Sequence, residues 1–151
     1  DTQGAGIMNT LVDGYQPWFG LIPQRISGAL VADRNGKVTT YACVGMADRG
    51  ELFTPVGIDV YDGMVIGERN REGDLNVNIC REKKLTNMRA SGSDNTVTIR
   101  PPRRLSLDQY IEFIAEDELV EVTPNNIRLR KMELDQNKRI TLKRKEKYTS
   151  Q

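Results

Sequence analysis

The sequence predicts a mainly β protein with one clear α-helix, arranged as a small β-barrel-like domain. Short β-prone runs separated by turn residues recur along most of the chain, which is typical of an all-β barrel or sandwich. Only one segment combines a helix cap with apolar residues at helical spacing. The chain has 151 residues, of which 38% are hydrophobic and 28% charged, so it can bury one core of ordinary size.

The first strands are predicted from β-prone runs and the breaks between them. Residues 7–12 form a short β-prone run, and the prolines and glycine of residues 17–23 mark a crossing between two structural units. Residues 26–32 and 37–45 flank Asn35-Gly36, a favoured type I′ turn centre because both residues accept positive φ. We therefore expect a hairpin whose second arm is a central strand, since apolar residues lie on both of its faces.

The middle of the chain predicts three further strands. Residues 60–66 are β-prone, and Gly63 within them indicates a bulge or a close approach of another backbone. Residues 75–80 alternate apolar and polar side chains, which is the period of a half-buried strand. Residues 96–99 form the last strand of this group. Residues 101–102 end it, because two prolines cannot donate to a sheet.

One helix is predicted to begin after Ser106, where Gln109 completes a capping box. We expect this helix to end near residues 116–117. Its apolar face follows the i, i+3, i+4, i+7 spacing and consists of Leu107, Tyr110, Ile111 and Ile114, widened by Phe113. Residues 119–122 and 127–130 then predict a second hairpin-like pair. From residue 135 the chain is polar and basic, and we interpret it as a frayed helix or a disordered tail.

The composition excludes several kinds of chemistry. The chain has no histidine, which excludes a Ser-His-Asp triad, a Cys-His pair, a histidine-ligated zinc and a histidine pH switch within it. Cys43 and Cys80 are single and far apart, and we interpret them as buried reduced thiols. No phosphate-loop motif is present, and no apolar run approaches the roughly 18 residues of a membrane span.

The formal net charge of +1 hides a strong segregation of charge. Residues 106–123 contain six Asp or Glu and no Lys or Arg. Residues 81–104 contain seven Lys or Arg against two Asp or Glu, a net charge of +5. The tail at residues 138–147 has six Lys or Arg against one Glu, again +5, and we expect a flexible, solubilising end.

The segment between two predicted strands, residues 81–94, is long for a loop and is called the basic loop below. Its cations suit phosphates, and its amide and hydroxyl groups suit sugars or base edges, so it predicts an RNA contact. It contains no aromatic residue, which argues against base stacking of the RRM type. On its chemistry alone, the loop could equally be a solvated surface whose cations pair with the acidic segment.

The basic loop also carries a family resemblance. Its residues 81–92 read Arg-Glu-Lys-Lys-Leu-Thr-Asn-Met-Arg-Ala-Ser-Gly, which resembles the K-K-L-T-N-M-R-A-S/A-G stretch of the TypA/BipA translational GTPases. Residues 60–68, 101–107 and 117–124 resemble three further stretches of that family, in the same order and spacing. The sequence is therefore identified as a member of this family.

The resemblance implies which part of such a protein this chain represents. Residues 1–16 would be the last strand of a truncated ferredoxin-like α/β domain, and residues 17–132 the family-specific C-terminal β domain. Residues 133–151 would be the basic tail, to which we assign no function. The resemblance places the GTP-binding domain outside the chain. We therefore expect no enzyme activity and no cofactor here, with GTP and Mg²⁺ bound only in that missing domain.

The resemblance also implies a cytoplasmic, ribosome-binding module that docks near the A site. Its partners would be large-subunit rRNA and the acceptor end of A-site tRNA, with no membrane. The expected RNA-binding residues all lie in the basic loop: Arg81, Lys83, Lys84, Thr86, Asn87, Arg89 and Ser91. The alternative is a protein-interaction module that contacts ribosomal proteins through its acidic helix. We expect a monomer, although the orphan strand in residues 1–16 could pair with a second chain.

Overall fold

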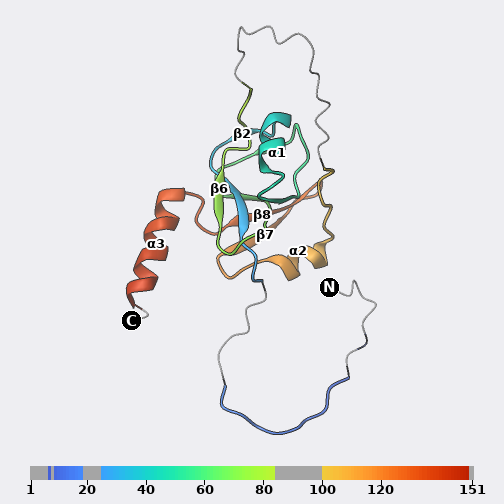
Figure 1. Ribbon diagram of the computed structural model, residues 1–151, viewed down its shortest axis with the longest axis vertical. Helices are drawn as coiled ribbons and strands as arrows, with labels where there is room; N and C mark the ends of the chain where they lie inside the picture. Colours follow the sequence, from blue (N-terminus) through green and yellow to red (C-terminus); the bar gives the residue numbers. More distant parts are fainter. Residues whose placement is uncertain (1–6, 8, 19–24, 84–99, 150–151) are drawn as a thin grey trace.

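A computed structural model describes residues 7, 9–18, 25–83 and 100–149 and confirms a mainly β fold (Figure 1). The described residues contain eight strands and three helices, whereas the sequence predicts one clear helix and a tail that is a frayed helix or disordered. The elements are β1 (Ala29–Ala32), β2 (Gly36–Lys37), α1 (Thr40–Met46), β3 (Gly50–Leu52), β4 (Asp59–Val60), β5 (Met64–Arg69), β6 (Leu75–Val77), α2 (Leu107–Phe113), β7 (Glu118–Val122), β8 (Ile127–Lys131) and α3 (Gln136–Thr149).

Six strands form one mixed sheet in the order β6-β1-β5-β8-β7, with β3 also paired to β5. β1 and β6 run parallel, and the other neighbours in this sheet are antiparallel. β5 is shared along its length, because its first two residues pair with β8 and its last three pair with β3. In the part of the chain that the structure describes, β6 and β7 do not pair, so the sheet is open.

The central strand β1 divides the hydrophobic core into two clusters. Leu30 and Ala32 join the cluster beneath α1, which also contains Ile66 of β5 and Ile79 after β6. The alternate residues of β1 join a second cluster, with Phe53, Val65 and Leu129, that is covered by α2. All four residues of β1 are fully buried, as expected for a strand with a packed layer on each face.

The hairpin predicted around Asn35-Gly36 is wrong, because residues 40–46 form α1. Thr39 is extended and caps this helix, its hydroxyl accepting a hydrogen bond from the Ala42 amide at 3.2 Å. Ala42 and Cys43 then face the core. β2 pairs with β4 instead of β1. The β-prone composition of this segment is therefore overridden by the cap and by packing against the sheet.

The single strand predicted at residues 60–66 is divided at Gly63 into β4 and β5. Gly63 has φ +83°, and a Cβ there would lie 2.8 Å from the Cα of Leu134. The predicted close backbone approach is therefore confirmed. Residues 75–80 bury Val77 and Ile79 as their alternation predicts, although the ladder ends at Val77. The strand predicted at residues 96–99 lies outside the described residues.

The capping box of α2 is confirmed: Ser106 and Gln109 each accept a hydrogen bond from the other's backbone amide. The helix is shorter than predicted, because Ile114 already has extended backbone angles. Its predicted apolar face is only partly used. Tyr110, Phe113 and Ile114 pack against the core, while Leu107 and Ile111 remain exposed.

The two ends of the described chain agree with expectation only in part. The hairpin of β7 and β8 is formed as predicted. The tail is an ordered helix, α3, which lies beside the sheet in Figure 1 and begins where the Asp135 carboxylate accepts the amides of Asn137 and Lys138. The strand predicted at residues 7–12 is absent among the described residues there, whose side chains are exposed.

Candidate functional site

Of the seven residues predicted to bind RNA, the structure describes two, at the N-terminal end of the basic loop. Arg81 and Lys83 follow β6, and both are exposed. The other predicted residues, Lys84, Thr86, Asn87, Arg89 and Ser91, lie outside the described residues. The described part of the site therefore consists of the residues on either side of the undescribed stretch, up to Lys83 and from Arg100.

The N-terminal end of the basic loop is fixed to the cap of α1. The Thr39 amide donates to the Ile79 carbonyl at 3.1 Å, and the Thr39 hydroxyl donates to the Arg81 carbonyl at 2.5 Å. The same hydroxyl oxygen accepts from the Ala42 amide as the helix cap. The hydrogen bonds of one threonine therefore join the helix to the loop.

The chain re-enters the described fold at Arg100 and is fixed there to β3. The Arg103 amide donates to the Leu52 carbonyl at 2.8 Å, and its guanidinium lies 3.2 Å from the Glu68 carboxylate. Arg100 and Pro101 line a cavity of about 300 Å³ together with residues of α1 and β3. α1 therefore lies between Arg81, at the start of the basic loop, and Arg100, where the described chain resumes, as Figure 1 shows.

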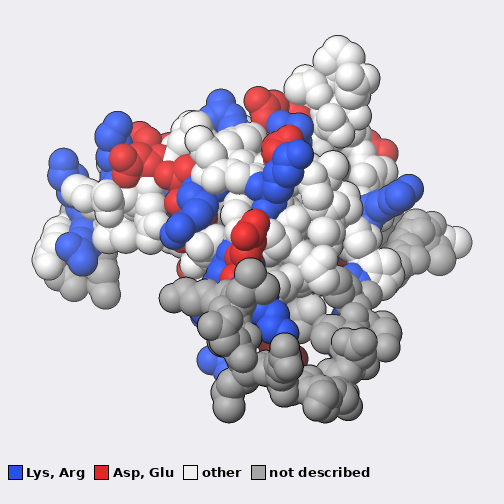
Figure 2. All heavy atoms as spheres, turned by 90° about the horizontal axis from the view of Figure 1, so that it is seen from above, with Lys and Arg blue, Asp and Glu red and all other residues white. Residues whose placement is uncertain are grey.

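Several cations around α1 have no carboxylate partner in the described ranges. Arg81, Lys83 and Arg100 are exposed, and none makes an ion pair with another described residue. The same holds for Arg104, which follows Arg103. In contrast, Arg34 pairs with Asp33, and Arg103 pairs with Glu68 and Glu51. Figure 2 views the molecule from this end and shows Lys and Arg side chains spread over the described surface, among fewer acidic ones.

Half of the carboxylates of the acidic segment have partners inside the domain. Glu118 is buried and receives two hydrogen bonds of 2.9 Å from Arg25. Burial alone would raise the pKa of Glu118, but Arg25 and Lys131 outweigh it, so the pKa lies below its usual range. Glu121 accepts from the Tyr61 hydroxyl at 2.8 Å, and burial together with this carboxylate raises the pKa of Tyr61 to about 12.

Lys131 is the second cation of this buried cluster, and it is 1% exposed. Its ammonium lies 2.8 Å from Asp74, 3.0 Å from Asp117 and 2.8 Å from Glu118. Three of the six acidic residues in this segment, namely Asp117, Glu118 and Glu121, therefore have partners within the fold. None of these contacts involves Arg81 or Lys83, the two cations of the basic loop that the structure describes.

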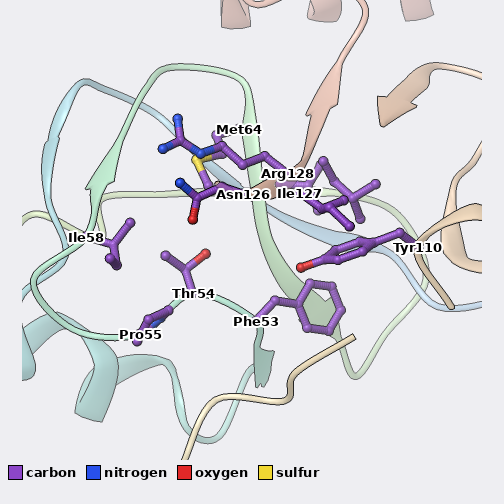
Figure 3. A pocket seen from close by; sticks show the side chains of 11 residues that line it. Phe53, Thr54, Pro55, Ile58, Met64, Tyr110, Asn126, Ile127 and Arg128 are labelled. Carbon is purple, nitrogen blue, oxygen red and sulfur yellow. The ribbon is translucent and has the colours of Figure 1, made fainter. Parts of the chain in front are cut away.

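A second cavity, of about 180 Å³, lies at the start of β8 and away from the loop (Figure 3). The hydroxyl of Tyr110 points into it, Phe53 forms one wall, and Asn126 and Arg128 stand at its rim. Small-molecule sites generally enclose about 300–1,000 Å³, so this cavity is small for one. Sequence reasoning did not identify it, because its walls come from three separate parts of the chain, residues 53–65, 110 and 126–129.

Other kinds of site find no residues in the described ranges. No group of three or more Cys, Asp or Glu side chains there could hold a metal ion. Cys43 is buried as predicted, which raises the pKa of its thiol, whereas Cys80 is half-buried. None of the described helices has the length and apolar character that crossing a lipid bilayer requires.

Comparison with known proteins gives the class to which this β domain belongs. The family profile of the TypA/BipA C-terminal domain matches residues 27–136. The chain is 45% identical over 147 residues to the large ribosomal subunit assembly factor BipA of Bacillus subtilis, covering 97% of the chain and 24% of that protein. It is 46% identical over 139 residues to BipA of Escherichia coli K12, covering 91% and 23%.

A plant relative extends the comparison beyond bacteria. The chain is 48% identical over 128 residues to the putative elongation factor TypA-like SVR3, chloroplastic, of Arabidopsis thaliana, covering 85% of the chain and 19% of that protein. The chain thus spans about a quarter or less of the length of these relatives. It belongs to the TypA/BipA family and contains that family's C-terminal domain, as the resemblance of the basic loop implied.

Proposed function

We propose that this domain docks onto the ribosome by placing the basic loop against RNA near the A site, in contact with large-subunit rRNA and the acceptor end of tRNA. The observation that carries the proposal is the set of exposed cations around α1, which have no carboxylate partner in the described part of the chain. The bacterial relatives are named large ribosomal subunit assembly factors, which supports a ribosomal partner. The cytoplasm is the corresponding location.

The proposed mechanism is docking without a bond made or broken. Arg81 and Lys83 neutralise phosphates, as do Lys84 and Arg89 farther along the loop, and each neutralised phosphate releases counterions. Thr86, Asn87 and Ser91 provide amide and hydroxyl groups that fix the register on sugar or base edges. The domain supplies a rigid base for the loop. GTP hydrolysis, with its Mg²⁺, is proposed for the GTP-binding domain of the whole protein.

The proposal is tested by co-sedimentation of the chain with large ribosomal subunits over a range of salt concentrations. We expect Lys84→Glu with Arg89→Glu to weaken binding and to flatten the log–log salt slope by about 0.7–0.9 for each phosphate that the variant no longer neutralises. Arg71→Glu with Lys138→Glu makes the same charge change at exposed positions outside the loop and serves as the control. Unchanged binding and slope in the loop variant would show that the assignment is wrong.

A second candidate function is a contact with a basic ribosomal protein through the acidic helix. The observation that favours it is the exposure of Glu112 and Glu116, which have no cation partner among the described residues. Leu107 and Ile111 are also exposed on α2. In this case Glu112→Lys with Glu116→Lys weakens ribosome binding, while the loop variant binds normally.

A further inference from the structure

The helix between the two ends of the basic loop supplies an aromatic surface that the loop itself lacks. Tyr41 lies in the first turn of α1 and is 44% exposed. The Arg81 guanidinium carbon lies 5.7 Å from the centre of the Tyr41 ring. The Thr39 hydroxyl donates to the Arg81 carbonyl at 2.5 Å, which holds the Arg81 backbone beside the cap of α1 at the N-terminal end of the loop.

The contact between Arg81 and Tyr41 is loose. Groups in direct contact lie about 3.5–4.0 Å apart, and cation–π attraction extends to about 6 Å from the ring centre. At 5.7 Å the guanidinium is attracted to the ring without covering it closely. Arg81 also makes no ion pair within the described ranges, so its charge is available to an incoming anion.

Tyr41 is not required for the packing of its helix. The residues of α1 that are buried against the sheet are Ala42 and Cys43, and Met46 is partly buried in the same cluster. Tyr41 belongs to neither core cluster. Tyr41 is thus a partly exposed aromatic side chain beside exposed cations. Such a pair suits the recognition of a planar group attached to an anion.

We propose that Tyr41 stacks on an unpaired RNA base while Arg81 neutralises the phosphate attached to it. This inference rests on the proposed RNA-docking function. It adds that the RNA nucleotide bound at the N-terminal end of the basic loop is not base-paired. Lys83 is exposed two residues farther on and suits the next phosphate. Stacking uses the face of the base, so we expect little preference among bases.

The test uses the whole chain and a short single-stranded oligoribonucleotide with 2-aminopurine at its centre, whose fluorescence is quenched when the base stacks. We expect quenching on binding by the wild-type chain and by Tyr41→Phe, which keeps the ring. Tyr41→Leu should lose the quenching and bind at least about 5-fold more weakly, the lower end of the effect of removing a stacking residue. Arg81→Gln should keep the quenching but lower the salt slope by about 0.7.

Outcomes against the inference can be separated from outcomes against the proposed function. If Tyr41→Leu binds and quenches like wild type while Arg81→Gln loses salt slope, stacking is wrong and the RNA contact stands. If the wild-type chain binds neither the oligonucleotide nor large subunits at low salt, both are wrong. A perfect duplex of the same sequence should show no effect of Tyr41. Full competition by an equal concentration of adenosine monophosphate would assign the surface to a free nucleotide and overturn the RNA assignment.

Discussion

The ammonium of Lys131 lies 2.8 Å from the carboxylate of Glu118, and both side chains are buried. The oxygen of Glu118 that accepts from Lys131 also accepts from Arg25, and the other oxygen accepts from Arg25 and from the Ala115 amide, so the buried carboxylate is satisfied by hydrogen bonds. Removing one member of such a cluster leaves uncompensated charge in the interior, which is costly.

We therefore predict that Lys131→Met lowers the free energy of unfolding by about 3–5 kcal/mol. Methionine fills much of the space of the lysine stem but leaves the carboxylates of Asp74 and Glu118 without their shared cation. Urea unfolding followed by circular dichroism measures the change. Lys138→Met, at an exposed position on α3, is the control and should change stability by less than about 0.5 kcal/mol. Equal stability of the two variants would contradict the role of Lys131.

Stability should also fall in acid. Burial would raise the pKa of Asp74, but Lys131 and Lys143 outweigh it and lower the pKa below its ordinary value of 3.8. Burial would likewise raise the pKa of Glu118, but Arg25 and Lys131 lower it below its ordinary value of 4.5. A carboxyl group whose pKa is lowered by folding stabilises the fold at any pH above its ordinary pKa. This stabilisation is lost as the pH falls through the pKa of the folded state. We expect a flat free energy of unfolding from neutral pH to about pH 5 and a decline below it.

The variant Asp74→Asn isolates part of this acid dependence. It removes one carboxyl that titrates differently in the folded and unfolded chains, so the decline below about pH 5 should become shallower. Urea unfolding at several pH values provides the measurement. An acid dependence identical to that of the wild type would show that Asp74 carries none of it.

Gly63 should be intolerant of a side chain for two separable reasons. Its φ of +83° disfavours other residues, and a Cβ there would meet the Leu134 backbone at 2.8 Å. Gly57 has a φ of +86° but open space around it, which makes Gly57→Ala a matched control for the backbone effect alone. We expect Gly57→Ala to cost about 1 kcal/mol and Gly63→Ala clearly more. Similar losses in thermal unfolding would contradict the close approach.

The helix α3 should be held to the sheet by two side chains. Arg139 donates to Asn76 at 2.7 Å, and Lys143 lies 2.8 Å from Asp74. We predict that Arg139→Gln with Lys143→Gln speeds amide hydrogen exchange in residues 136–145 while lowering global stability by no more than about 1–2 kcal/mol. The control Lys138→Gln with Arg144→Gln removes the same charge from α3 at side chains that make no ion pair with another described residue. Amide exchange in residues 136–145 of this control should stay near that of the wild type.

How far the sequence predicts this fold depends on whether the signal is local. The capping box at Ser106 and the hairpin of β7 and β8 depend on neighbouring residues, and both are predicted correctly. The helix α1 is not, because the β-prone residues after Thr39 become helical through a cap and a packing surface that only the folded sheet provides. This misassignment also conceals Tyr41, since an aromatic residue in a central strand would be buried. The available signal is Thr39 itself, because threonine is a favoured N-cap residue.

The candidate site is predicted by a different kind of information. The basic loop stands out through charge and family resemblance, and Arg81 and Lys83 are exposed where it leaves the fold. The acidic segment resembles a surface feature in the sequence, since a sequence does not show which cation reaches a carboxylate. Arg25 is 93 residues from Glu118, and Lys131 lies on the next strand.

The buried charge cluster extends beyond the region matched by the family profile. Arg25 precedes the region matched by the family profile, and Lys143 follows it. A protein trimmed to residues 27–136 would keep every strand of the sheet but lose the cations at both ends of the cluster. We therefore expect a chain trimmed to residues 27–136 to be less stable than the whole chain, because Glu118 loses Arg25 and Asp74 loses Lys143.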